Sequence, residues 1–279
     1  MSTRKTSDSK MGHRKILYLI AMLSLIVFIL SSCQVNQESA NEELTIFAAA
    51  SLRETFNDLE LAFESENPGT DIQINYAASS TLQAQIKQGA EADLFASADY
   101  LQIWKLSSDV GVSKPIPFAQ NDLALVVSQK TAGIDNFDDI LAPGIKIVTA
   151  LPEVPIGSYS VLAIKEIEMA GYYGNEFPDN FARNIVSMET NVRSMLSRVV
   201  LGEVDAAIVY STDISKELEN SVKRISFPIK IDTKPTYFIA TLVPGDEKEA
   251  STKFLELLSS EEGAAILLDN GFRPIKQDN

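Results

Sequence analysis

After its first forty residues the chain alternates short apolar segments with segments of helical spacing, and this alternation limits the fold more than any other feature. Residues 44–50 (LTIFAAA) have the character of a buried strand. In residues 51–66, apolar side chains recur every three or four residues, as on one face of a helix. These apolar positions are Leu52, Phe56, Leu59 and Phe63.

The same pattern continues to the C-terminal end of the chain. Further strands are predicted at 71–76, 93–97, 123–128, 145–149, 185–187, 205–210 and 236–243, and further helices at 80–88, 157–170, 192–201, 253–258 and 264–268. Strand–helix–strand order is typical of an α/β fold, with a mostly parallel sheet and helices on its faces.

Several predicted strands lead directly into a helix through a turn that contains Ser, Thr, Asn or Gly. Such a turn presents backbone N–H groups without helical partners, where the helix dipole adds roughly half a positive charge. In an open α/β sheet these turns gather at the carboxyl ends of the strands, where ligands bind, so they could hold an anion without a cation. The alternative at each turn is ordinary helix capping. The turns are 48–52, 77–82, 154–158 and 189–193.

The N-terminus resembles a bacterial lipoprotein signal. Residues 11–15 are basic, and the apolar run 16–30 is shorter than the about 20 residues that a transmembrane helix needs. It is typical of a secretory signal peptide, and it ends in Leu-Ser-Ser-Cys. We therefore predict a signal peptide at 1–32, and a lipidated Cys33 with a polar tether at 33–43. The alternative is a plain membrane anchor with an incidental cysteine.

Charge and composition exclude several functions. The chain has a net charge of −14, and the segment 1–32 carries five basic residues and one acid, so the mature chain has a charge of −18. This argues against nucleic acid or anionic lipid as a partner. His13 is the only histidine and Cys33 the only cysteine, so the mature chain has no Ser-His-Asp triad, no histidine metal ligand and no free thiol. We predict no enzymatic activity, no cofactor and no cation site.

Six motifs lie between residues 44 and 274: 47–52 (FAAASL), 78–82 (ASSTL), 89–99 (GAEADLFASAD), 154–157 (VPIG), 191–193 (NVR) and 208–211 (IVYS). They resemble those of the molybdate-binding proteins of ABC uptake systems. The stretch 89–99 is the most specific of them. At Ile156 many members of that family have a small residue, a change that is tolerable if the position contributes only its backbone N–H.

This resemblance implies a type II periplasmic binding protein fold, in which two α/β lobes enclose a ligand cleft. Lobe I would comprise 44–122 plus 234–279, and lobe II 123–233. The implied oxyanion ligands are the hydroxyl and backbone groups of Ser51 and Ser79, the backbone N–H of Ile156 and Val192, and the hydroxyl of Tyr210. Ser80 and Asn191 would support the geometry.

The resemblance also implies a function. The protein would bind molybdate and tungstate outside the cytoplasmic membrane, close its lobes around the anion and deliver it to the permease of an ABC importer. The chain has no phosphate-binding loop of its own, so ATP hydrolysis would belong to the transporter. It would be anchored to the membrane through lipid on Cys33, on the periplasmic side or cell surface, as a monomer by default. The alternatives are a receptor for another oxyanion, such as tungstate or sulfate, and a surface lipoprotein that kept the fold without transport.

Three other side chains are expected to have structural roles. Arg53 and Arg193 lie next to proposed ligands but are predicted to point outward and to pair with Glu54 or Glu189. Trp104, in a helix after Asp99, is predicted to pack in the core.

Overall fold

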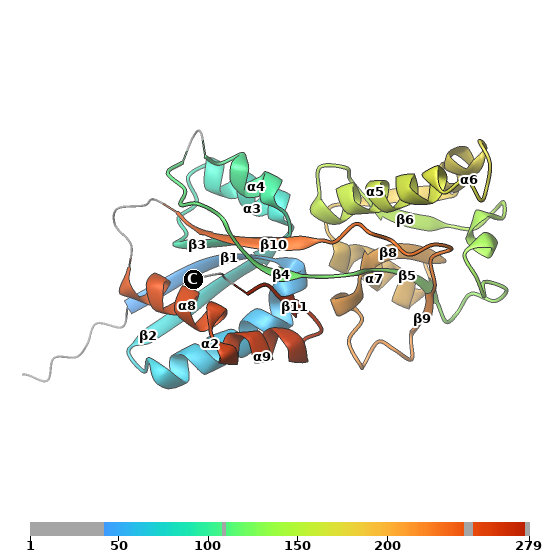
Figure 1. Ribbon diagram of the computed structural model, residues 1–279. Coiled ribbons are helices and arrows are strands. Elements are labelled where there is room, and N and C mark those ends of the chain that lie inside the picture. Colours follow the sequence, from blue (N-terminus) through green and yellow to red (C-terminus); the bar gives the residue numbers. More distant parts are fainter. Residues whose placement is uncertain (1–41, 108–109, 243–247, 277–279) are drawn as a thin grey trace, which may run out of the picture. The chain divides into compact units, whose positions relative to one another are not determined.

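The computed structural model describes residues 42–107, 110–242 and 248–276 (Figure 1). The predicted signal peptide, the lipidated Cys33 and the tether lie outside the described residues. In the described part of the chain no helix has the length and apolar character needed to cross a membrane.

Two β-sheets form within these residues. The first has six strands in the order β11-β4-β10-β3-β1-β2. Strand β1 runs parallel to β2 and β3, whereas β10 is antiparallel to both β3 and β4. The strands are β1 (Glu42–Ala49), β2 (Thr70–Ala77), β3 (Leu94–Ser97), β4 (Ile116–Gln120), β10 (Thr236–Thr241) and β11 (Arg273–Pro274).

The second sheet of the described chain has five strands in the order β7-β6-β8-β5-β9. Strand β6 runs parallel to β7 and β8, and β5 is antiparallel to β8 and β9. The strands are β5 (Leu123–Ser128), β6 (Ile147–Ala150), β7 (Ile185–Glu189), β8 (Ala206–Tyr210) and β9 (Val222–Ile225).

Helices cover both faces of each sheet (Figure 1). Helices α2, α8 and α9 pack on one face of the first sheet, and α3 and α4 on the other. On the second sheet α7 covers one face, and α5 and α6 the opposite one. The helices are α2 (Arg53–Glu66), α3 (Ser79–Lys87), α4 (Tyr100–Trp104), α5 (Pro155–Met169), α6 (Phe177–Arg183), α7 (Val192–Leu201), α8 (Glu249–Ser259) and α9 (Glu261–Asp269), with short 3₁₀ turns η1 (Ala50–Leu52), η2 (Asp138–Leu141) and η3 (Ser211–Asp213).

The predicted α/β architecture with two lobes is confirmed, but the prediction of a mostly parallel sheet is wrong. Both sheets are mixed, because the chain passes between them twice. It leaves the first sheet at Asn121 and Asp122, directly between β4 and β5, and returns through 226–235 to β10 (Figure 1). The strands next to these two crossover segments run antiparallel to their neighbours. We propose that residues 44–122 plus 234–279 form lobe I and residues 123–233 form lobe II.

Helix α7 shows why the periodic elements were predictable. It covers Val192–Leu201, the range that its apolar spacing predicts. Met195, Leu196 and Val199 are buried on one side of it. The helix ends at Gly202, whose φ of 75° lies in the left-handed region that glycine adopts without steric cost.

Helix α4 corrects one prediction. Trp104 is 57% exposed rather than packed in the core. The helix has only five residues, and Gln102 and Ile103 occupy its buried side, so the next position faces outward. The sequence pattern also does not predict the short strands β4, β9 and β11.

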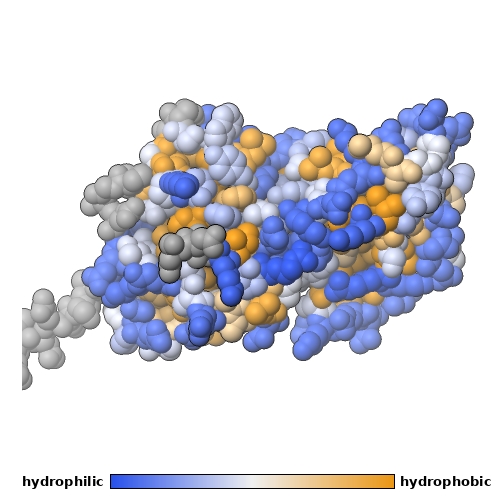
Figure 2. All heavy atoms as spheres, viewed as in Figure 1, coloured by the Kyte–Doolittle hydropathy of each residue, from blue (hydrophilic) through white to orange (hydrophobic). Residues whose placement is uncertain are grey.

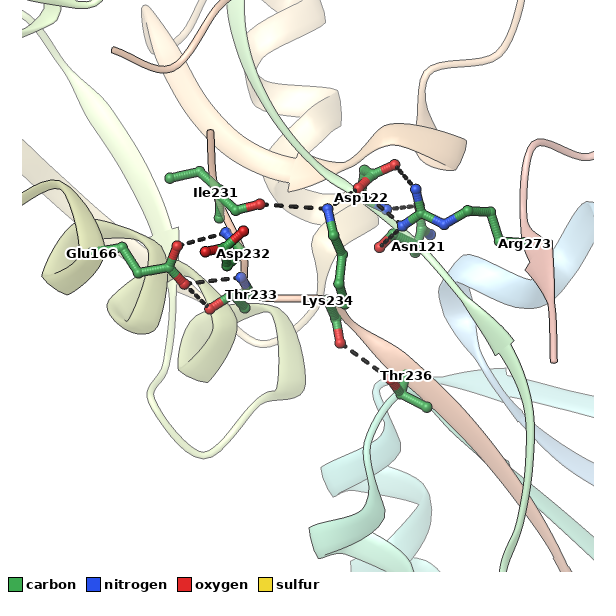
Figure 3. Close-up of polar contacts among 9 residues, drawn as sticks. All are labelled: Asn121, Asp122, Glu166, Ile231, Asp232, Thr233, Lys234, Thr236 and Arg273. Atoms are coloured by element: carbon green, nitrogen blue, oxygen red, sulfur yellow. Dashed lines mark hydrogen bonds and ion pairs between the residues drawn. The ribbon is translucent and has the colours of Figure 1, made fainter. Parts of the chain in front are cut away.

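The crossover segments are held together by charged groups. Asp122, on the first segment, accepts hydrogen bonds from Lys234 on the second at 2.7 Å and from Arg273 of β11 at 2.6 Å (Figure 3). Glu166 of α5 accepts from the backbone N–H of Thr233 at 2.9 Å. Figure 2 shows hydrophilic residues dominating the middle of this face, with hydrophobic groups on either side. The path between the lobes is therefore fixed by polar contacts.

Candidate functional site

A small cavity lies among the strand–helix turns of the two lobes. Its volume is about 20 Å³. On the same scale, a cavity that holds one water molecule has a volume of about 10–15 Å³. Both lobes contribute to its wall, and none of the lining residues carries a charged side chain. They are Ala49, Ala50, Ser51, Ala78, Ser79, Ala98, Val154, Pro155, Ile156, Asn191, Val192 and Tyr210. The structure thus brings the five residues of the predicted ligand set to one cavity.

Ser51 and Ser79 reach the cavity from adjacent strands. Strands β1 and β2 pair in parallel, with Ala49 opposite Ala77, so the turns after them leave the sheet side by side. Ser51 follows in η1, and Ser79 is the first residue of α3. Neither side chain caps its helix, so the capping alternative does not account for these two serines.

Ile156 and Val192 reach the cavity in the same way from the second sheet. Strands β6 and β7 pair with Ala150 opposite Glu189, and each is followed by a helix. Ile156 is the second residue of α5 and Val192 the first of α7. Backbone N–H groups in a first helical turn have no partner within the helix, so they are available to a ligand.

Asn191 behaves as the capping alternative predicts. Its side-chain oxygen accepts a hydrogen bond from the backbone N–H of Ser194 at 2.9 Å, which caps α7. Its carboxamide therefore shapes the turn before Val192. Ser80 is absent from the cavity lining.

Tyr210 supplies the most informative group. It ends β8, it is 2% exposed, and its hydroxyl has no hydrogen-bond partner among the described residues. Burial raises the pKa of this hydroxyl well above its ordinary value of 10, so it keeps its proton. A buried polar group without a partner costs about 1–3 kcal/mol. A ligand with an acceptor atom would remove that penalty.

Each of the two serine hydroxyls has a hydrogen-bond partner within lobe I. The hydroxyl of Tyr237 lies 2.9 Å from Ser51 Oγ, and the backbone N–H of Ala98 donates to Ser79 Oγ at 3.0 Å. Sequence reasoning missed Tyr237, because it lies on β10, 186 positions from Ser51. No local sequence motif predicts a contact between residues so far apart in the chain.

A charged cluster lies next to the ligand residues in sequence. Arg193, which follows Val192, forms an ion pair with Glu54 of lobe I, one of its two predicted partners. Its Nε lies 3.6 Å from Asp213, whose side chain is fully buried. Burial raises the pKa of Asp213 to about 7, although Arg193 opposes the shift. Sequence reasoning missed Asp213, which looked like one surface acid among many.

Comparison with known proteins places this chain in a family. Residues 44–273 match the family described as bacterial extracellular solute-binding protein. The chain belongs to this family. The match includes nearly all of both sheets and every residue of the predicted ligand set.

Two curated relatives of this solute-binding protein are similar over most of their length. The molybdate-binding protein ModA of Mycobacterium tuberculosis is 32% identical, over 82% of this chain and 84% of the relative. The putative ABC transporter substrate-binding lipoprotein YvgL of Bacillus subtilis is also 32% identical, over 91% of this chain and 97% of the relative.

A solved structure is similar as well. The substrate-binding domain of a putative molybdenum ABC transporter from Clostridium difficile is 27% identical, with a TM-score of 0.60. The similarity covers 84% of this chain and 99% of that structure.

Direct contacts between the lobes close the solute-binding protein around its cavity. Gln102 of α4 donates to the backbone oxygen of Glu153 at 3.1 Å. Tyr159 of α5 donates to the backbone oxygen of Ala98 at 3.3 Å and accepts from the N–H of Thr236 at 3.2 Å. The structure therefore shows the lobes in contact.

The chemistry of the cavity is that of a hydrogen-bond donor set. The polar side chains of its lining residues are the hydroxyls of Ser51, Ser79 and Tyr210 and the carboxamide of Asn191, and the helix starts at Ile156 and Val192 add backbone N–H groups. Among residues 42–107, 110–242 and 248–276, no group of three or more His, Cys, Asp or Glu side chains could hold a metal ion. Such a set suits a small ligand whose surface consists of acceptor atoms.

Proposed function

We propose that this solute-binding protein captures molybdate, with tungstate as a second ligand, outside the cytoplasmic membrane and delivers it to the permease of an ABC transporter. The observation that carries the proposal is the buried Tyr210 hydroxyl, which has no hydrogen-bond partner within the described part of the chain and lines an uncharged cavity closed by both lobes. The names of the relatives at 32% identity support the choice of solute.

The donor set explains why an oxyanion would bind to so acidic a protein. Every oxygen of a tetrahedral dianion is an acceptor. Neutral O–H and N–H donors can therefore surround the anion without placing a protein lone pair against an oxygen of the anion. Hydrogen bonds to a charged partner are the stronger class, worth about 1.5–3 kcal/mol each. A lining whose hydroxyl and N–H groups donate to the ligand favours anions that carry no proton at neutral pH, such as molybdate.

Each proposed ligand has a defined contribution. Ser51 and Ser79 would donate hydroxyl hydrogens from lobe I, and Tyr210 would donate one from lobe II. Ile156 and Val192 would donate backbone N–H groups at the starts of α5 and α7, where the helix dipole favours negative charge. Because the donors come from both lobes, the anion would stabilise the closed form.

The transport role adds four further proposals. Lipid on Cys33 would keep the protein at the membrane surface, where the permease is, and the protein would act as a monomer. It would have no catalytic activity, since the cavity offers no base or nucleophile pair and the mature chain lacks histidine. Transport energy would come from the transporter's ATPase subunits.

Thermal unfolding of the mature chain with molybdate, tungstate, sulfate or phosphate tests the proposal. A ligand at 100 times its Kd adds about 2.7 kcal/mol to stability. For a chain of this size we expect molybdate and tungstate to raise Tm by about 5–10 °C. Phosphate should leave Tm unchanged because it keeps a proton at neutral pH, and sulfate should leave it unchanged because it is smaller than molybdate.

A shift with sulfate alone would keep the oxyanion site but replace the proposed solute. If none of the anions shifts Tm, the oxyanion proposal is wrong, and a surface lipoprotein without transport becomes the better explanation.

Replacing Tyr210 with phenylalanine separates binding from folding. We expect molybdate affinity to fall about tenfold or more, because one hydrogen bond to the anion is lost. The unliganded protein should be as stable as the wild type or slightly more stable, because an unsatisfied buried hydroxyl has been removed. Calorimetric titration and urea unfolding measure the two quantities.

Tyr173→Phe is the matched control. Its hydroxyl donates to Asp138 on the surface of lobe II, so affinity should not change. If Tyr210→Phe destabilises the unliganded protein while leaving affinity intact, the hydroxyl has a structural role and does not contact the ligand.

A further inference from the structure

The hydrogen bond between Ser51 and Tyr237 can run in either direction, and the direction matters for the cavity. The two hydroxyl oxygens are 2.9 Å apart, and both side chains are buried. If Ser51 donates to Tyr237, it presents only lone pairs to the cavity. If Tyr237 donates to Ser51, the Ser51 hydrogen is free for an anion.

Asn121 favours the second direction. Its side-chain oxygen accepts from the backbone N–H of Asp122 at 2.8 Å. The amide nitrogen therefore faces two hydroxyls, Thr212 Oγ at 2.8 Å and the Tyr237 oxygen at 3.5 Å. An amide nitrogen can only donate. The Tyr237 oxygen therefore accepts from Asn121. Tyr237 is fully buried, and Ser51 is the other hydrogen-bond partner of its hydroxyl among the described residues, so the Tyr237 hydrogen is directed to Ser51.

Ser79 has the same arrangement with a backbone donor. The N–H of Ala98 donates to Ser79 Oγ at 3.0 Å, and a backbone N–H cannot act as an acceptor. Both serine oxygens thus already accept one hydrogen bond from lobe I. Both hydroxyl hydrogens are left to point into the cavity.

We propose that Tyr237 is a positioning residue that sets the donor direction of Ser51, and through it the preference of the cavity for fully deprotonated oxyanions. The inference rests on the proposed function. An anion that keeps a proton, such as hydrogen phosphate, must donate it to an acceptor. A Ser51 hydroxyl held as a donor opposes such an anion, whereas a freely rotating one tolerates it.

Tyr237→Phe tests the inference, because phenylalanine keeps the ring contacts with Tyr210 and Phe272. Calorimetric titration of the mature chain with molybdate and phosphate gives both affinities. We expect molybdate affinity to fall about fivefold to tenfold, the usual size of one hydrogen bond, and the molybdate-to-phosphate ratio to fall with it. Tyr173→Phe should change neither quantity.

A double-mutant cycle with Ser51→Ala distinguishes positioning from a general loss of structure. If Tyr237 acts through Ser51, adding Tyr237→Phe to the Ser51→Ala protein should change molybdate affinity by less than about twofold. Equal effects of Tyr237→Phe with and without Ser51 would overturn the inference.

The two proposals fail in different ways. If Tyr237→Phe keeps wild-type affinity and selectivity, the inference is wrong but the proposed function stands. If the wild type binds neither anion, both are wrong. Should Tyr237→Phe fail to fold, Asn121→Asp replaces the donor with an acceptor and should reverse the Tyr237 hydroxyl. Unchanged selectivity in that variant would also overturn the inference.

Discussion

Replacing Gly157 with alanine should destabilise the protein by about 3 kcal/mol or more, at the upper end for overpacked sites, and should abolish tight anion binding. A Cβ at this position would lie 2.1 Å from the backbone oxygen of Leu151 and 2.9 Å from that of Ala150. These are backbone atoms, so the clash cannot be relieved by a side-chain rotation. The first turn of α5, which carries Ile156, would have to move away from the end of β6.

Gly263 provides a matched control. A Cβ there would lie 2.1 Å from the backbone oxygen of Leu257 and 2.9 Å from that of Leu258, so the clash has the same size. It lies in α9, which contributes nothing to the cavity wall. Urea unfolding should show similar losses for Gly157→Ala and Gly263→Ala, but the folded fraction of the second should bind molybdate like the wild type. Equal affinities in the two variants would contradict the assignment of the α5 start to the site.

Replacing Arg193 with methionine should lower the free energy of unfolding by about 3–5 kcal/mol at pH 9. This is the usual loss when a buried charge is left without its partner. Arg193 reaches Asp213, which is fully buried, and Glu54 on the other lobe. The substitution therefore removes the positive charge next to the buried Asp213 carboxylate, and it breaks the ion pair with Glu54 that links the two lobes. We also expect weaker molybdate binding, because the closed form loses that link.

The pH dependence identifies Asp213 as the cause. Burial raises the pKa of Asp213 to about 7 in the folded protein, above its ordinary 3.8. The stability contributed by the protonated group is therefore present below about pH 4 and is lost as the pH rises through about 7. Without Arg193 the pKa should rise further, so the stability difference from wild type should be larger at pH 9 than at pH 6.

Two further variants complete this experiment. Arg198→Met, in the same helix, removes surface pairs with Glu189 and Glu203 and should cost less than about 1 kcal/mol. Adding Asp213→Asn to Arg193→Met should recover most of the loss and flatten its pH dependence. If the loss is the same at both pH values, Asp213 is not the group responsible.

The sequence by itself was enough for features that depend on local periodicity and backbone geometry. Helix α7 and strand β5 were predicted with the bounds that the structure has, because an apolar face repeats along each of them. The strand–helix order predicted an α/β fold. The serine-bearing turns identified helix starts, since each is a short-range signal.

Motif resemblance extended the prediction to the ligand set and to two lobes. Residues from distant turns, such as Ser51 and Tyr210, were assigned to one site without any geometric argument. The register of β1 with β2, and of β6 with β7, then shows how adjacent strand ends bring these turns together.

Only the tertiary structure decided the strand directions and the residues that surround the cavity-lining side chains. The mixed direction of the sheets follows from two passages of the chain between the lobes, and a residue pattern does not record direction. Tyr237 and Asp213 gained their roles through burial beside residues far away in the chain, whereas Trp104 was left exposed by the short helix that holds it. Local sequence determined which backbone groups could face a ligand. Packing between distant segments determined the partners and environments of the polar side chains around them, because hydrogen bonding and burial depend on neighbours in space.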